Sequence, residues 1–248
     1  MERTRSFFTA FVCSMAGFVW LLGGEVSALG GLIAVAIPVI GWWLPWHKWR
    51  VARRVAIALG AGLGAVGAVG LLADTVCAFL PLWQIILGII LFTALLVYIG
   101  REPLRRASIL LGGVTAAGIL LLCLCALPMA SGGVRVAFHD AFYLPLGGLA
   151  MLGGGLTALE CRCQRRAARW GGIAGAGLYL CAAFAALAVW SPAAVARLGY
   201  PILSAFRRVD LFSLIFCPDI MLAAAVALCA MLQWSAALRI VFPLQKNK

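Results

Sequence analysis

The chain has 248 residues, of which 65% are hydrophobic and only 11% are charged, and its formal net charge is +12. Soluble domains carry about 25% charged residues, so the composition excludes a soluble globular protein. The basic residues form short clusters between long apolar segments instead of one stripe, which argues against nucleic-acid binding. The composition therefore indicates an integral membrane protein whose main partner is the lipid bilayer.

Eight apolar segments follow one another along the chain, and each is long enough to cross a bilayer as a helix. They are apolar on all sides, whereas the strands of a membrane β-barrel alternate apolar and polar residues. We expect an all-α, polytopic transmembrane helix bundle of about eight spans, in one integral membrane domain over residues 1–248. The predicted spans are residues 7–23, 26–45, 55–73, 83–100, 107–130, 142–159, 170–190 and 211–237.

The distribution of lysine and arginine supports this number of spans. If the spans alternate in direction, 16 of the 20 basic residues fall on one side, in residues 3–5, 48–54, 101–106, 162–169 and 239–248. Basic loops of membrane proteins stay in the cytoplasm, so we expect a multi-pass protein of the cell membrane with both termini cytoplasmic. A cleavable signal peptide is disfavoured, because bulky residues end the first apolar run and no small-residue cleavage site follows.

Three of the predicted spans are rich in glycine. The third contains GAGLGAVGAVG, the sixth GGLAMLGGG and the seventh GGIAGAG. Small residues four positions apart, such as Gly60 and Gly64, allow helices to approach closely in lipid, which predicts a tightly packed bundle. The alternative is that some of these glycines break their helices beside a binding site, as in transporters.

Acidic residues on the predicted outer side are candidates for a solute site, because an ionised carboxylate in the membrane must face protein or water. Asp219 is the strongest candidate. It follows Pro218 within the last span, and a proline there frees carbonyl groups that a cation or amino group can use. The alternative is a proline kink, with Asp219 bonded to a neighbouring helix. The candidate substrate-binding residues are Asp219, Pro218, Gly23, Gly24, Glu25 and Asp74.

No motif in the sequence indicates an enzyme, a cofactor or a metal site. The two histidines, His47 and His139, are predicted on opposite sides of the membrane, and no nucleotide-binding or hydrolase motif is present. Most of the nine cysteines lie in apolar runs, where cysteine acts as a small hydrophobic residue. Cys161 and Cys163 form a lone C-x-C that lacks the second ligand pair of a zinc site, so filler or lipidation is favoured.

The segment YPILSAFRRVDLF before the last span resembles the entry to the eighth helix of endospore germination permeases, the membrane B subunits of germinant receptors. The family has a Tyr-Pro-x-x-Ser loop followed by an Arg-x-Asp/Glu pair. The matching residues here are Tyr200, Pro201, Ser204, Arg208 and Asp210. Residues 73–111 also resemble the family in an outside turn, a short span and a Gly-Arg-x-x-x-x-Arg entry to the fifth helix.

The resemblance implies a shortened amino-acid-permease-type fold with broken first and sixth helices. It also implies a subunit that binds or senses a small zwitterionic solute such as an amino acid, with other membrane subunits, in the spore inner membrane. Arg208 and Asp210 would have a structural or gating role, and the alternative is that they form only a solvated ion pair. The competing interpretation of the whole chain is a non-transporting assembly subunit, because polar residues are scarce and the family's final helices are missing.

Overall fold

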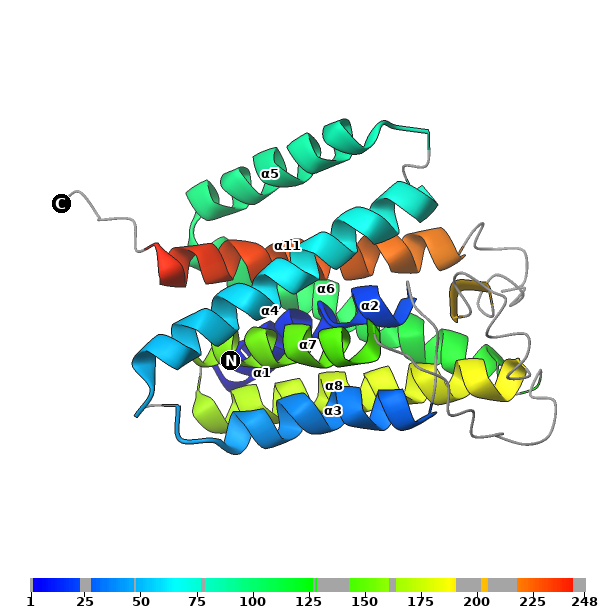
Figure 1. Cartoon of the computed structure of the whole chain (residues 1–248), viewed down its shortest axis with the longest axis horizontal. Coiled ribbons are helices and arrows are strands. Elements are labelled where there is room, and N and C mark those ends of the chain that lie inside the picture. The colour runs from blue at the N-terminus through cyan, green and yellow to red at the C-terminus, as the bar shows by residue number, and fades with distance from the viewer. Residues whose placement is uncertain are drawn as a thin grey trace.

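The computed structural model describes residues 2–22, 28–46, 48–76, 79–126, 128, 143–160, 164–190, 202–204 and 218–242. Within these ranges the regular structure is helical, and the long helices lie side by side in a bundle (Figure 1). The elements are α1 (Glu2–Met15), α2 (Phe18–Leu22), α3 (Ala28–Trp43), α4 (Arg50–Leu71), the π-helical turn η1 (Leu72–Val76), α5 (Leu82–Ile99), α6 (Arg101–Ala126), α7 (Tyr143–Glu160), α8 (Arg165–Val189) and α11 (Pro218–Val241). The predicted all-α helix bundle is therefore confirmed.

Each predicted span overlaps at least one of these helices, but the helices differ in length. Five described stretches are long and apolar enough to cross a membrane, namely Arg50–Thr75, Leu82–Ile99, Glu102–Ala126, Arg165–Val189 and Asp219–Val241. The apolar stretches of α3 and α7, Gly31–Trp43 and Leu146–Glu160, are shorter, and the first predicted span is divided into α1 and α2. The long apolar helices make this a membrane protein, whereas the side on which its termini lie stays a prediction.

The basic segments that were predicted on one side of the membrane lie together at one end of the bundle. α1 begins and α11 ends at this end (Figure 1). Arg5 of α1 forms an ion pair with Glu102 of α6, with 2.7 Å between Nη1 and Oε1. Arg53 of α4 forms an ion pair with Glu160 at the end of α7. These pairs agree with the alternating helix directions that the charge distribution predicts, and we call this end of the bundle the basic end.

Glycines of α4 and α7 bring helix backbones into contact at the centre of the bundle. A Cβ atom added to Gly60 of α4 would lie 2.6 Å from the Cα atom of Gly153 in α7. One added to Gly154 would overlap the carbonyl oxygen of Cys13 in α1. α4, α7 and α8 run unbroken through their glycines, so these glycines serve tight packing and the helix-break alternative is wrong for them. Because α7 is the sixth predicted span, the break that the resemblance implied in that span is also wrong.

The helix α5 lies at the edge of the bundle, where it packs mainly on α11 (Figure 1). Its Ile89 side chain belongs to a small buried cluster with Met231 of α11. Near the end of α11, Nη2 of Arg239 donates to the carbonyl oxygen of Leu96 at 2.8 Å and also to that of Val97. Carbonyl groups in the last turn of a helix lack partners within it, so Arg239 fastens the end of α5 to α11.

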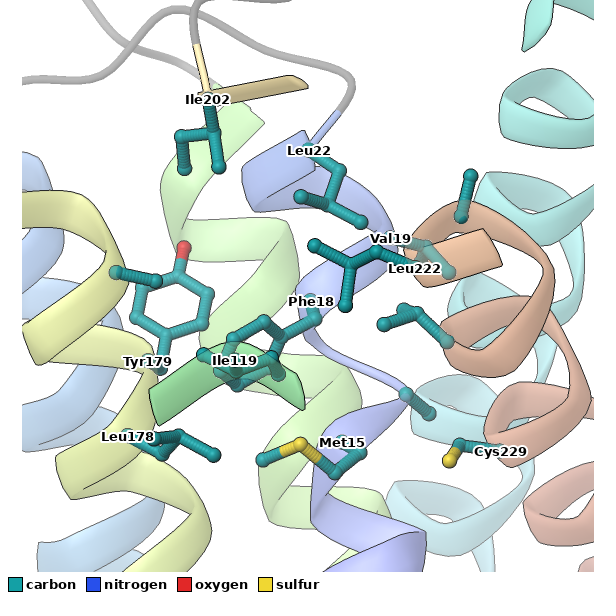
Figure 2. Close-up of a cluster of buried hydrophobic side chains, with 14 of the residues drawn as sticks. Met15, Phe18, Val19, Leu22, Ile119, Leu178, Tyr179, Ile202, Leu222 and Cys229 are labelled. Atoms are coloured by element: carbon teal, nitrogen blue, oxygen red, sulfur yellow. The ribbon is translucent and has the colours of Figure 1, made fainter. Parts of the chain in front are cut away.

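The largest apolar cluster forms where α1, α2, α8 and α11 meet (Figure 2). Met15 and Phe18 lie on either side of the division between α1 and α2, and both side chains are fully buried. Tyr179 of α8 and Leu222 of α11 pack in the same cluster. The interior is therefore centred on the interrupted first span.

Candidate functional site

The first predicted span is interrupted near its middle. α1 ends at Met15, α2 begins at Phe18, and a turn at Gly17 joins them. The Gly17 N–H donates to the carbonyl oxygen of Ser14 at 3.1 Å, and the Gly17 carbonyl oxygen accepts from the Trp20 N–H at 3.2 Å. Irregular backbone at membrane depth is tolerated only where protein or water surrounds it, so the neighbours of this turn decide what it can do.

Helices α4 and α8 close around the turn. A Cβ atom added to Gly64 of α4 would lie 3.3 Å from the side chain of Ala16. The ring of Phe18 packs edge-on against the ring of Tyr179 in α8, with 5.2 Å between the ring centroids (Figure 2). The break is therefore enclosed by protein, with a small residue on one flank and an aromatic residue that carries a hydroxyl on the other.

The hydroxyl group of Tyr179 is a polar group inside this apolar core. The side chain is 0% exposed, and no described residue forms a hydrogen bond with the hydroxyl. A Cβ atom added to Gly147 of α7 would lie 3.2 Å from this hydroxyl and 3.1 Å from the carbonyl oxygen of Gly17. A buried hydroxyl that makes no hydrogen bond costs about 1–3 kcal/mol. The hydroxyl is therefore a candidate contact for a polar ligand beside the break.

Gln233 of α11 is a second polar group near the break. Its side chain is fully buried, and its Nε2 donates to the carbonyl oxygen of Ala150 in α7 at 3.1 Å. Its Oε1 forms no hydrogen bond within the described part of the chain, and it would lie 3.1 Å from a Cβ atom added to Gly64. Gly64 also faces Ala16, which lies in the turn. Gln233 therefore approaches the break from α11, whereas Tyr179 approaches it from α8, where its ring packs on Phe18. Neither residue was predicted as a site residue, although each carries a polar group within a predicted span.

Asp219 lies in the first turn of α11 and is buried. The residue is 3% exposed, and its Oδ1 atom is out of contact with solvent. Leu222 and Val226, three and seven positions later, are buried too, so Asp219 lies on the face of α11 that packs into the protein. Leu222 shares the central cluster with Leu22, the last residue of α2 (Figure 2). A carboxylate at this position also gains from the partial positive charge at the helix N-terminus.

The other predicted site residues have different positions. Asp74 lies in η1, which contacts α11, but its side chain is exposed. Pro218 is the first residue of α11, and the residues directly before it lie outside the described part, so the kink there stays a prediction. The remaining predicted site residues that lie outside the described part are Gly23, Gly24, Glu25, Arg208 and Asp210. The observed break at Gly17 comes six residues before Gly23.

The described side chains offer no evident metal centre. Over the described ranges, no three histidine, cysteine, aspartate or glutamate side chains lie close enough to hold a metal ion. The described cysteines are Cys13, Cys123, Cys125, Cys181 and Cys229, of which Cys13 and Cys229 are buried. Cys161 and Cys163 lie outside the described part. The chemistry available at the break is hydrogen bonding by oxygen and amide groups, with one buried carboxylate in α11.

Replacing Tyr179 with phenylalanine removes the buried hydroxyl and keeps the ring. We expect the ligand-free protein to gain about 1 kcal/mol of stability, because an unsatisfied buried polar group is lost. That gain corresponds to an unfolding midpoint about 2–4 °C higher, measured by thermal unfolding in detergent. Tyr98→Phe is the matched control, since Tyr98 is exposed at the end of α5, and it should leave the midpoint unchanged. A lower midpoint for Tyr179→Phe would mean that the hydroxyl is stabilised by a partner.

No model of a known protein family matches this chain, and no curated protein matches its sequence. The resemblance to germination permeases therefore depends on the sequence motifs alone. The break in the first span, the buried hydroxyl and the buried carboxylate are the structural observations on which a function can be argued.

Proposed function

We propose that this chain is a permease-like membrane subunit that binds a small zwitterionic solute, such as an amino acid, inside the helix bundle. The observation that carries the proposal is the break in the first span beside the buried hydroxyl of Tyr179. The Gly17 N–H and carbonyl groups are bonded to Ser14 and Trp20 within the turn, so the turn can offer a solute the second lone pair of the Gly17 carbonyl oxygen. The Tyr179 hydroxyl adds one donor and two acceptor positions in an apolar surrounding.

Asp219 supplies the charge in this proposal. A buried carboxylate in a membrane bundle can attract a cation and accept its hydrogen bonds, and the ammonium group of an amino acid offers both a positive charge and N–H donors. Asp219 lies on the inward face of α11, and α11 contacts α2, the half-helix that follows the break. The solute then lies between the broken first span and the beginning of the last helix, with its amino group toward Asp219.

We infer from the charge distribution that this half of the bundle, opposite the basic end, faces the outer side of the cell membrane. A solute would therefore reach Asp219 from outside while both termini remain cytoplasmic. This arrangement fits a sensor or permease subunit that works with other membrane subunits, which is the role that the germination-permease resemblance implies. In that case the protein belongs to the spore inner membrane.

The proposal is tested by titrating the common amino acids into the full-length protein in lipid nanodiscs, using isothermal titration calorimetry. We expect saturable binding of at least one amino acid. Tyr179→Phe should weaken that binding about tenfold, since one buried hydrogen bond contributes about 1.5 kcal/mol. Absence of binding for every amino acid, in protein that unfolds cooperatively, would contradict the proposed function.

A non-transporting assembly subunit is the second candidate, and the exposed surface of α5 favours it. α5 is mostly apolar, yet Trp83, Leu91 and Tyr98 are all largely exposed in the isolated chain. Such a surface fits lipid or a helix of another subunit. Purification from native membranes in mild detergent should then retain a stoichiometric membrane partner. Recovery of the chain alone after chemical crosslinking would count against the assembly role.

A further inference from the structure

A pocket of about 140 Å³ opens at the basic end of the bundle, at the opposite end from Asp219 at the start of α11 (Figure 1). The ends of α3 and α7 meet the beginnings of α4 and α8 there. Three arginines and one acid contribute to its lining, and these charged residues are Arg53, Arg165, Arg169 and Glu160. Three guanidinium groups and one carboxylate give the lining a net charge of +2. The pocket therefore favours an anion.

Two of these arginines are held in place by neighbouring side chains. Arg53 forms an ion pair with Glu160. The guanidinium carbon of Arg169 lies over the ring of Trp43, 5.0 Å from its centroid, which is a cation–π contact. The Nε atoms of Arg53 and Arg169 are buried, and neither makes a hydrogen bond to a described residue. Both arginines therefore hold a positioned N–H donor that another acceptor can use.

The remaining lining indicates the depth of the pocket in the membrane. Trp42 and Trp46 contribute to the lining, and the neighbouring Trp43 is 66% exposed. Tryptophan is enriched where a helix bundle meets the headgroup layer. The lining thus combines indole rings with guanidinium groups at the level of lipid phosphates. Planar guanidinium groups bind phosphate oxygens in pairs, and basic pockets between membrane helices hold anionic headgroups.

We propose that this pocket binds a phosphate group, supplied either by an anionic phospholipid headgroup or by phosphate in solution. Arg53 and Arg169 donate to the phosphate oxygens through their positioned guanidinium groups, and Arg165 adds a third positive charge. Glu160 orients Arg53 but repels the anion. The site is independent of the proposed solute site, since it uses none of the same residues.

Two measurements on the full-length protein distinguish the sources of phosphate. Native mass spectrometry in neutral detergent counts the dioleoyl-phosphatidylglycerol molecules that remain bound, with dioleoyl-phosphatidylcholine as the comparison lipid. Tryptophan fluorescence follows a titration with inorganic phosphate against sodium chloride at equal ionic strength, because Trp42 and Trp46 line the pocket. Saturable binding in the first measurement alone assigns the site to lipid, and saturable binding in the second assigns it to free phosphate. Saturable binding in neither overturns the proposal.

Three variants test whether binding occurs in this pocket. Arg165→Gln combined with Arg169→Gln should weaken binding at least tenfold, and Arg169→Lys should weaken it less, because lysine keeps the charge but loses the planar fork. Arg54→Gln is the matched control, since Arg54 is exposed on α4 and does not line the pocket. It should change the affinity by less than twofold.

Glu160→Gln provides a test with the opposite sign. Removing this carboxylate raises the net charge of the lining and releases Arg53, so phosphate or lipid should bind several-fold more tightly. Equal weakening by Arg54→Gln and the Arg165/Arg169 variant would overturn the proposed location, because it would indicate a non-specific effect of charge. Weaker binding to Glu160→Gln would overturn it too. If the double variant fails to fold, Arg169→Lys and Glu160→Gln still decide the question.

Discussion

Alanine at Gly154 is expected to disrupt the packing of α7 against α1. The added Cβ atom would overlap the carbonyl oxygen of Cys13 and lie 2.5 Å from its carbonyl carbon and 3.1 Å from the backbone nitrogen of Ser14. Because the obstacle is helix backbone, the two helices must move apart. Overpacking of this kind costs about 1–3 kcal/mol. For a chain of this size each kcal/mol lowers the unfolding midpoint by about 2–4 °C, so we expect a clear fall in thermal unfolding experiments in detergent.

Gly177→Ala in α8 is the matched control for this substitution. A Cβ atom added at Gly177 meets nothing within 4 Å, and alanine is favoured over glycine in a helix by about 1 kcal/mol. The control should therefore keep or raise the unfolding midpoint. If Gly154→Ala unfolds at the same temperature as Gly177→Ala, or above it, the close contact between α7 and α1 is not present in the protein.

Helix positions and directions could be predicted from the sequence, because hydropathy and charge vary along the chain itself. The span predicted at residues 83–100 corresponds to α5, Leu82–Ile99, with a shift of one residue at each end. The assignment of residues 48–54 and 162–169 to one side agrees with the structure, since Arg53 and Arg169 line the same pocket at the basic end. The assumption that successive helices alternate in direction was sufficient to predict that residues 48–54 and 162–169 lie at the same end of the bundle.

The resemblance to germination permeases implied a break in the first span, but hydropathy and charge did not predict it. Apolar residues continue on both sides of Gly17, so an average over the span gives no sign of an interrupted helix. The glycines that suggested breaks, such as Gly60 and Gly154, lie in continuous helices. Their role depends on the residue opposite, which is Gly153 for Gly60 and Cys13 for Gly154. A glycine pattern alone does not separate close packing from a broken helix.

The candidate site could be predicted only where charge was involved. Asp219 could be identified because a carboxylate within an apolar span is costly, and such a residue indicates a functional site. Tyr179 and Gln233 gave a weaker signal, since one hydroxyl or amide in a membrane helix commonly bonds to a neighbouring helix. Their importance follows from tertiary structure, in which the Tyr179 hydroxyl and the Gln233 Oε1 are buried without a hydrogen bond to a described residue.

Asparagine at Asp219 is expected to abolish or strongly weaken solute binding while the bundle stays folded. Asparagine has nearly the same size as aspartate and still accepts a hydrogen bond, but it lacks the negative charge that pairs with an ammonium group. A hydrogen bond to a charged group contributes about 1.5–3 kcal/mol, so the dissociation constant should rise by about 10- to 100-fold. Calorimetric titration in nanodiscs, with the amino acid that binds the unaltered protein, measures this change.

Asp74 was also predicted to bind the solute, but its exposed side chain leaves it out of the proposed interior site, so Asp74→Asn is the control for charge at the same end of the bundle. Asp74 lies in η1, next to α11, and its side chain is exposed rather than buried. The control removes the same charge without altering the interior, so the dissociation constant should change by less than twofold. If Asp219→Asn lowers the unfolding midpoint but leaves the affinity unchanged, Asp219 serves only the packing of α11. The proposed site would then lack its charged residue, and recognition of an amino group there would be ruled out.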